Sequence, residues 1–253
     1  MKKILLFALP LLAMCFTSCE KDNGNNGEEL SGDDVIQFKD PNFLKALLTV
    51  QEISLYDAET DDWIPYTMDV DSNGDGQITV NEAKAVRGLE ISGCGITNME
   101  EIKYFTSIEY LGCCFNQIRN LTLDNHSNLV YLACGDNEGD IPFTTLNVSG
   151  CPALVELLCE GGNLTNLDLS HNVELRGLIC SDNDITSLDL SKNHKLQSFY
   201  PFGFIAHGND GMPEFSGKCP LESLILYKNH SISEDNMNYI NLAYPDLKIT
   251  YAE

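Results

Sequence analysis

The chain has 253 residues, with 38 acidic against 15 basic side chains and a formal net charge of −23 at pH 7. Nucleic-acid partners and anionic lipid surfaces are bound by clustered Lys and Arg, so this composition argues against both as partners of the protein surface. Hydrophobic residues make up 43% of the chain, which is normal for a globular protein.

Residues 1–18 have the features of an export signal. Lys2 and Lys3 precede the apolar stretch Ile4–Met14, which is too short to span a bilayer as a helix. The following Phe16-Thr-Ser-Cys19 resembles a bacterial lipobox. That resemblance implies cleavage before Cys19 and lipidation of its thiol; ordinary secretion with an incidental cysteine is the alternative.

Residues 19–34 are polar, acidic and rich in Gly and Asn, which indicates a flexible tether. Acidic residues directly after a lipid-bearing cysteine resemble the export signals of Bacteroidetes surface lipoproteins. The resemblance implies a protein on the outer face of the outer membrane that touches the membrane only through its lipid. Removal of residues 1–18, which hold two lysines and no acids, changes the net charge to −25.

The strongest chemical motif lies in the next region, residues 35–88. The segment Asp71–Glu82 matches the calcium-loop pattern D-x-[DN]-x-[DN]-G-x5-E at every defined position. Hard oxygen ligands at this spacing suit Ca²⁺. The expected ligands are Asp71, Asn73, Asp75, the backbone carbonyl of Gln77, Thr79 and Glu82.

The flanks of this loop favour helices. Pro41–Leu48 predicts a helix that enters the loop, and Glu82–Val86 predicts one that leaves it. Residues 35–88 therefore resemble the EF-hand-like caps placed before the repeats of Bacteroidetes surface lipoproteins. One loop of this kind is visible, which favours a structural Ca²⁺ over a paired sensor. An unliganded polar turn is the alternative.

Residues 89–230 repeat a short pattern. Four blocks begin 21, 25 and 21 residues apart: Leu111-Gly-Cys113, Leu132-Ala-Cys134, Leu157-Leu-Cys159 and Leu178-Ile-Cys180. Leu89-Glu-Ile91, Phe199-Tyr-Pro201 and Leu224-Ile-Leu226 extend this first motif. An asparagine follows five residues after the first anchor at Asn116, Asn137, Asn183 and Asn229.

A second motif lies half a period later, at Leu121-Thr-Leu123, Leu146-Asn-Val148, Leu167-Asp-Leu169 and Leu188-Asp-Leu190. The combined pattern resembles leucine-rich repeats, in particular the 21-residue repeats of Bacteroidetes surface lipoproteins and the internalin-like group. We therefore predict an α/β repeat protein. It is a leucine-rich repeat solenoid of short parallel strands between an EF-hand-like helical cap (35–88) and a C-terminal helix–strand cap (231–253).

The four cysteines of the first motif recur with the repeat period rather than at metal-binding spacing. We therefore expect them to form one column of small side chains in the core: Cys113, Cys134, Cys159 and Cys180. Cys151 and Cys219 lie off that column and could either pair or stay free. At the C-terminus, Ser233 is a predicted N-cap for a helix that ends before Pro245, and residues 247–251 predict a last strand.

The sequence holds no recognisable catalytic motif, and we predict a protein that is not an enzyme. The five histidines stand mostly beside Asn or Ser, which indicates solvated turns.

The outward positions of the predicted strands turn apolar and aromatic toward the C-terminus. This predicts a binding face made of Leu158, Ile179, Tyr200, Phe202, Ile225 and Tyr227. The insert from Pro201 onward would either extend this face or fold back over it. The expected role is adhesion to, or recognition of, a host or bacterial surface protein or glycan. A structural envelope protein without a ligand, and a hydrolase or accessory subunit of glycan uptake, are the alternatives.

Overall fold

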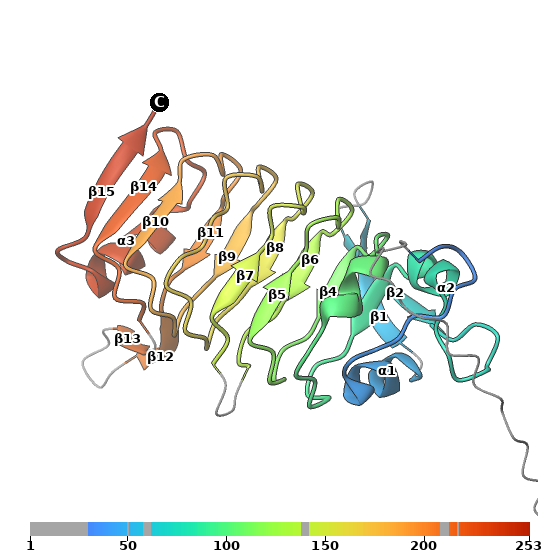
Figure 1. Cartoon of the computed structure of the whole chain (residues 1–253). Helices are drawn as coiled ribbons and strands as arrows, with labels where there is room; N and C mark the ends of the chain where they lie inside the picture. The colour runs from blue at the N-terminus through green and yellow to red at the C-terminus, as the bar shows by residue number, and fades with distance from the viewer. Residues whose placement is uncertain (1–29, 50, 58–61, 138–141, 208–212, 217) are drawn as a thin grey trace, which may run out of the picture.

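The computed structural model describes residues 30–253 except 50, 58–61, 138–141, 208–212 and 217. The predicted signal peptide, Cys19 and most of the tether lie outside these residues. The chain winds into a solenoid that runs from α1 and α2 at one end to β15 at the other (Figure 1). Within the described part, no helix is both long and apolar enough to cross a membrane.

The first motif forms one parallel sheet of six strands in the order β11-β9-β8-β6-β4-β3. The strands are β3 (Gly88–Glu90), β4 (Tyr110–Gly112), β6 (Tyr131–Ala133), β8 (Glu156–Leu158), β9 (Gly177–Ile179) and β11 (Ser198–Tyr200). The register pairs each inward leucine with the next, as in Leu111 with Leu132 and Leu157 with Leu178. The parallel solenoid predicted from the period is confirmed.

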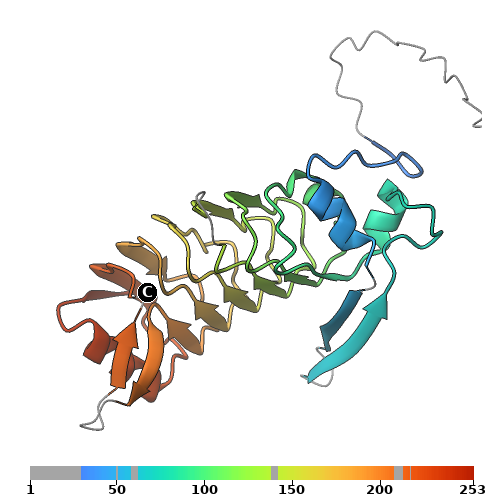
Figure 2. The ribbon, with the colours of Figure 1, turned by 90° about the horizontal axis from the view of Figure 1, so that it is seen from below.

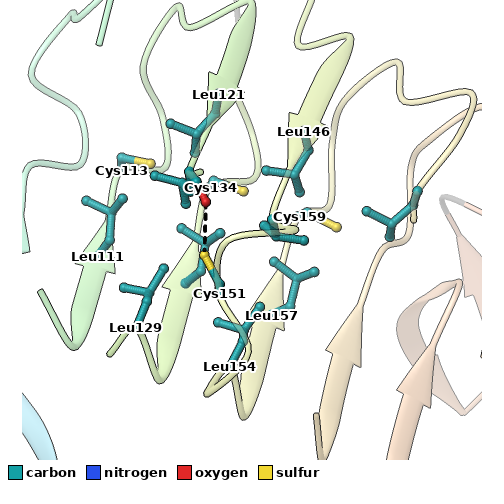
Figure 3. Close-up of a cluster of buried hydrophobic side chains, with 14 of the residues drawn as sticks. Leu111, Cys113, Leu121, Leu129, Cys134, Leu146, Cys151, Leu154, Leu157 and Cys159 are labelled. Atoms are coloured by element: carbon teal, nitrogen blue, oxygen red, sulfur yellow. Dashed lines mark hydrogen bonds between the residues drawn. The ribbon is translucent and has the colours of Figure 1, made fainter. Parts of the chain in front are cut away.

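Two columns of inward side chains build the core beneath this sheet (Figure 3). The leucine column is completely buried, and the cysteine column is at most 1% exposed; its members are Cys113, Cys134, Cys159 and Cys180. All described cysteines are free thiols. The thiol of Cys219 lies 2.9 Å from the carbonyl oxygen of Cys180 and so extends the column, whereas that of Cys151 contacts the Leu123 carbonyl at 3.6 Å. The predicted core ladder is confirmed.

A buried asparagine column joins neighbouring turns. The Oδ1 of Asn183 accepts a hydrogen bond from the N–H of Leu164 in the preceding turn at 3.0 Å. Its Nδ2 donates to the carbonyl of Cys159 at 2.8 Å and to that of Cys180 at 3.1 Å. Asn116 and Asn137 make corresponding bonds in their own turns. Each amide thus satisfies backbone groups that the turn leaves without a ladder partner.

The second motif lies on the other side of the solenoid. It forms the pair β5 (Asn120–Thr122) and β7 (Thr145–Asn147). It also forms a sheet of β10 (Ser187–Leu190), β14 (Ser223–Tyr227) and β15 (Lys248–Ala252).

The assignment of Leu224-Ile-Leu226 to the first motif is wrong. Leu224 pairs with Leu188 and Leu226 with Leu190, so β14 continues the second motif. The spacing misled because both motifs contain the same alternation of apolar residues, and the hairpin of β12 (Gly203–His207) and β13 (Pro213–Ser216) interrupts the period. For the same reason Asn229, predicted to lie in the asparagine column, is exposed.

The N-terminal cap differs from the predicted helix–loop–helix. Helix α1 (Pro41–Leu47) does not enter the loop directly, because the antiparallel hairpin of β1 (Gln51–Asp57) and β2 (Asp62–Met68) lies between them. Helix α2 (Val80–Ala85) follows the loop as expected. The hairpin was missed because its strands combine polar and apolar residues without a turn signal such as Asn-Gly.

Asp40 fastens this cap to the first turn. It is the N-cap of α1, and its buried carboxylate also accepts hydrogen bonds from Thr97 N–H at 2.6 Å, Thr97 Oγ1 at 2.7 Å and Asn98 N–H at 3.1 Å. Burial acts to raise the pKa of Asp40, but these bonds and the one from Asn42 outweigh it, so the pKa lies below its usual value.

The C-terminal cap closes the open edge of the six-stranded sheet. Helix α3 (Glu234–Ala243) begins at the predicted N-cap Ser233, whose hydroxyl accepts from the N–H of Asn236. The buried Asn236 amide accepts from the N–H of Phe199 at 2.9 Å and donates to its carbonyl at 3.0 Å. One side chain therefore satisfies the edge strand β11 as another strand would.

We predict that Asn183→Ala lowers the free energy of unfolding by roughly 2–3 kcal/mol, because it leaves buried backbone groups in two turns without partners. Asn229→Ala is the matched control and should cost about 0.5 kcal/mol or less, since this residue is exposed. Urea denaturation followed by circular dichroism measures both; equal effects would contradict the assignment of Asn183 to the ladder.

Candidate binding face

The outward side of the six-stranded sheet, here called the strand face, carries two rows of side chains. The row before the inward leucines consists of Gly88, Tyr110, Tyr131, Glu156, Gly177 and Ser198, and the row after them of Glu90, Gly112, Ala133, Leu158, Ile179 and Tyr200. Figure 2 shows this sheet and the second-motif strands on opposite sides of the solenoid. Both hairpins, β1–β2 and β12–β13, project on the side of the strand face, one at each end (Figure 2).

Three of the residues predicted for the binding face lie on it. Leu158 and Ile179 are half-buried in β8 and β9, and Tyr200 is 37% exposed in β11. Because these strands are hydrogen-bonded neighbours, the three side chains form a continuous apolar strip.

The other three predicted face residues lie elsewhere. Phe202 is only 3% exposed and packs between Tyr200, at a ring-centroid distance of 6.2 Å, and Tyr244, at 6.3 Å. Ile225 and Tyr227 belong to β14 on the opposite side, where Tyr227 stacks on His194 at 3.9 Å. Phe202 is core because the chain turns into the hairpin directly after β11, and the other two follow the corrected register of β14.

A stacked tyrosine pair in the N-terminal half of the strand face was missed by the sequence analysis. The rings of Tyr110 and Tyr131 are 4.9 Å apart and within 2° of parallel. The Tyr110 hydroxyl donates to Oε2 of Glu90 at 2.8 Å. Both tyrosines stand one residue before the leucine anchor, an outward row that the predicted face did not include. The period-2 alternation on both sides of each leucine is the signal that would have identified them.

Two glycines on the strand face make room for glutamate side chains. A Cβ at Gly112 would lie 2.2 Å from Oε2 of Glu90, and a Cβ at Gly177 would lie 1.8 Å from Oε2 of Glu156. Each glutamate therefore lies flat across the neighbouring strand, in space that any other residue would fill. Glycine weakens a strand interior, so these positions mark a close approach rather than a preference for the strand.

Glu160 carries a carboxylate in an unfavourable environment. Its Oε2 is buried and has no hydrogen-bond partner among the described residues. Burial raises the pKa of Glu160; a bond from its own backbone opposes this, and the charge of Asp136 adds to it. Burial also raises the pKa of Glu156, although Arg176 acts in the opposite direction. The strand face thus holds carboxylates that gain from a cation brought by a ligand.

Phe115 has a backbone conformation that costs free energy. One equivalent position is left-handed in five successive turns, with φ between 48° and 66°: Gly93, Phe115, Asp136, Gly161 and Asp182. Glycine and aspartate tolerate this conformation, whereas a bulky aromatic residue is strained in it. Phe115 is nevertheless 60% exposed, so packing does not compensate for the strain. An exposed and strained aromatic residue is a candidate for function.

We predict that Phe115→Asn raises the free energy of unfolding by about 1 kcal/mol, because asparagine accepts the left-handed conformation and little packing is lost. Phe115→Leu is the matched control: it keeps an apolar side chain and the backbone strain, and it should give no gain. Thermal and urea denaturation measure the difference. A loss of stability in Phe115→Asn would show that the ring supports the fold.

The thiol of Cys114, beside this face, is not activated as a nucleophile. Burial, and then the charges of Glu160, Asp136 and Glu90 against one bond from Gly135, raise the pKa of the Cys114 thiol to about 11. The thiol is therefore protonated at neutral pH and is a poor nucleophile.

His126 is not in a solvated turn as predicted. It is 1% exposed, and its Nε2 lies 3.0 Å from the carbonyl oxygen of Ile102, a buried residue of η1 (Glu100–Tyr104). His126 stands three residues after the end of its second-motif block, a position that Asn172 and Asn193 occupy in later turns. Both of these amides donate to backbone carbonyls of the preceding turn. Burial lowers the pKa of His126, which favours a neutral imidazole that serves as part of the core.

The calcium-motif loop is ordered by its own carboxylates. Asp71 Oδ1 accepts from the N–H groups of Gly74 at 2.9 Å and Asp75 at 3.1 Å, and its Oδ2 accepts from Gly76 at 2.8 Å. The φ angles of Gly74 and Gly76 are 72° and 79°, as a sharp turn requires. The donor set, which consists of carboxylate, amide and carbonyl oxygens, fits the chemistry of Ca²⁺.

The carboxylate of Glu82 is hydrogen-bonded to other groups of the protein. It forms a capping box with Thr79 and accepts from Ser72 N–H at 3.1 Å and Ser72 Oγ at 3.0 Å. Within the described residues, no three acidic, histidine or cysteine side chains gather as they would around a metal. Ion binding by this loop would therefore have to redirect the Glu82 carboxylate.

Comparison with known proteins supports the fold. No protein-family model and no curated protein matches the chain. The functional domain of InlJ from Listeria monocytogenes, which is described as including a cysteine ladder, matches with a TM-score of 0.52 and 25% identity, over 81% of this chain and 41% of that one. Internalin C2 from the same organism matches with a TM-score of 0.39 and 17% identity, over 85% and 94% of the two chains.

A leucine-rich repeat protein of Leptospira interrogans gives a TM-score of 0.35 and 19% identity, over 60% of this chain and 39% of that one. These two weaker matches add no argument of their own. The match to InlJ agrees with the buried columns of leucine and cysteine described above. The chain therefore has a leucine-rich repeat fold and spans less than half of the InlJ structure it resembles.

Proposed function

We propose that this chain is a cell-surface adhesion module that binds a partner protein through the strand face. The observation that carries the proposal is the set of aromatic residues on this face and at its edge: the Tyr110–Tyr131 stack, Tyr200 and the strained Phe115. Tyrosine is enriched among the few residues that carry most of the binding energy in protein interfaces. The hairpins at either end of the face bound an area several strands wide, which suits a protein partner.

The anchoring of this module is part of the same proposal. A lipid on Cys19, after removal of residues 1–18, would hold the protein on the outer face of the outer membrane. Residues 19–34 would then act as a tether that lets the solenoid reach a host or bacterial surface. The lipobox and the acidic residues after it support this arrangement.

Calcium binding by the loop at Asp71–Glu82 completes the proposal. The ion would have a structural role, because the loop joins hairpin β1–β2 to helix α2 at the end of the solenoid. Asp71, Asn73, Asp75, the carbonyl of Gln77, Thr79 and Glu82 would hold it. The full match to the motif and the two left-handed glycines support this site.

We predict that EDTA lowers the melting temperature of the protein by about 5 °C or more, because a ligand that binds only the folded state stabilises it. Asp71→Ala and Glu82→Gln should each lose this response. Asp69→Asn is the matched control, since this exposed acid lies just outside the loop and the variant should respond like the wild type. A wild-type melting temperature that is insensitive to EDTA and to added Ca²⁺ would refute the site.

The binding face is tested by capture of surface proteins. Immobilised protein is incubated with biotinylated surface extracts of host and bacterial cells, and the captured proteins are identified by mass spectrometry. Tyr131→Ala combined with Tyr200→Ala should reduce capture of a specific partner at least about ten-fold, as expected for removal of two aromatic anchors.

Tyr227→Ala combined with Tyr251→Ala is the matched control, because it removes two tyrosines from the opposite sheet. This variant should capture the partner as the wild type does. Equal capture by all three proteins would refute the strand face as the binding surface. Capture of glycans alone, measured on a glycan array, would change the class of partner.

A further inference from the structure

We propose that the N-terminal half of the strand face is a receptor for a lysine or arginine side chain on a basic segment of the partner protein. This inference rests on the proposed function of the strand face. The receptor, here called the tyrosine–glutamate cluster, consists of Glu90, Tyr110, Tyr131, Glu156 and Glu160.

The register of the sheet places three of these residues at equivalent positions of neighbouring strands. Tyr110 pairs with Tyr131, and Tyr131 pairs with Glu156 on the next strand. Neighbouring strands are about 4.8 Å apart, so the three side chains form one row of adjacent outward groups. Glu90 is tied to this row by its bond to the Tyr110 hydroxyl.

The space for the carboxylates is built into the sheet. Glu90 lies over Gly112 and Glu156 lies over Gly177, so each carboxylate rests on the backbone of a neighbouring strand. Glu160 lies beside Gly135, where a Cβ would be 2.6 Å from the Glu160 carbonyl oxygen and 3.1 Å from its carboxyl carbon. These acids are held on the surface of the sheet and are not freely solvated side chains.

The titration of neighbouring groups indicates a concentration of negative charge. The pKa of Tyr131 is raised first by burial, and the carboxylates of Glu90, Glu160 and Glu156 add to this effect. The pKa of Tyr110 is raised by burial and by its bond to Glu90. Glu90 and Glu160 also raise the pKa of Cys114, so their negative potential reaches both side chains.

A cation is the ligand group that satisfies this arrangement. Tyrosine rings attract ammonium and guanidinium groups through their negative faces. Carboxylates bind the same groups with charge-assisted hydrogen bonds. The buried Oε2 of Glu160, which has no hydrogen-bond partner in the described part of the chain, would gain one from such a donor.

The cation should belong to a protein segment and not to a free small molecule. Phe115 donates its N–H to the carbonyl of Gly135, the residue beside which Glu160 lies, and it offers an exposed ring that a small cation would not cover. A segment that places a basic side chain on the tyrosines and an apolar side chain on Phe115 would use both features.

The test uses fluorescence anisotropy with a fluorescein-labelled peptide of alternating glycine and arginine, titrated with the purified protein. Glu160→Gln combined with Tyr131→Leu should weaken binding of this peptide about ten-fold or more. Glu160→Gln alone is a nearly isosteric second variant, and it should weaken binding several-fold even if the double variant folds poorly.

Two controls separate a site from general attraction to an acidic protein. Asp168→Asn removes the same charge as Glu160→Gln, but from an exposed position of the second motif, and it should change the dissociation constant less than two-fold. A peptide of alternating glycine and serine should not bind. Equal weakening by Asp168→Asn and Glu160→Gln, or equal binding of both peptides by the wild type, would overturn the proposal.

This result is independent of the capture experiment. If the arginine peptide binds as expected but no surface protein is captured through the strand face, the proposed function fails and the cluster remains a cation receptor. If a partner is captured in a manner that depends on the strand face, while the peptide does not bind, the cluster assignment alone fails.

Discussion

The fold depends on the asparagine amides that join three of the turns to the turn before them. A single turn exposes one side of its leucine and cysteine, so it gains burial only when the next turn stacks on it. Stacking also brings together backbone groups at the bend, where the strand ladder has ended. Asn183 satisfies such groups in two turns at once, and Asn116 does so near the other end of the sheet. Without these bonds, the buried bends would offset much of the gain from the hydrophobic columns.

Backbone groups at the two ends of the stack also need hydrogen-bond partners, because no further turn is present there to supply them. Asn236 replaces a neighbouring strand with one amide, which bonds both the N–H and the carbonyl of Phe199. At the other end Asp40 caps α1 and accepts three bonds from Thr97 and Asn98. In each cap, one short polar side chain bonds the neighbouring turn. Asp40 does so from the start of α1, and Asn236 does so from within α3. A repeat protein needs such residues because its ends are chemically unlike its middle.

The interior of the repeats could be predicted from the sequence because its chemistry is periodic. Leucine, cysteine and asparagine return at the same positions, and each is required there by burial or by backbone hydrogen bonding. Prediction failed where one pattern serves two environments. Leu224-Ile-Leu226 satisfies either motif, and only the pairing with Leu188 and Leu190 decides between them. Phe202 reads as an outward residue by alternation, but the chain leaves the sheet at that point and turns the ring into the core.

A search for periodic residues does not find those that depart from the repeat, and the candidate site consists largely of such residues. Tyr110 and Tyr131 share a position that later turns fill with glutamate, glycine and serine. Phe115 occupies a position where other turns have glycine or aspartate, the residues that suit its left-handed backbone. Both are departures from what the repeat requires.

These departures also cost stability. Phe115 is strained, and Glu160 keeps a buried carboxylate oxygen without a hydrogen-bond partner in the described structure. In the same turn as Tyr131, by contrast, the buried amide of Asn137 both accepts and donates hydrogen bonds within the fold. Costs of this kind persist when another process benefits from them. Together with the two tyrosines, which also depart from the repeat, Phe115 and Glu160 make this half of the strand face the region that we propose for binding.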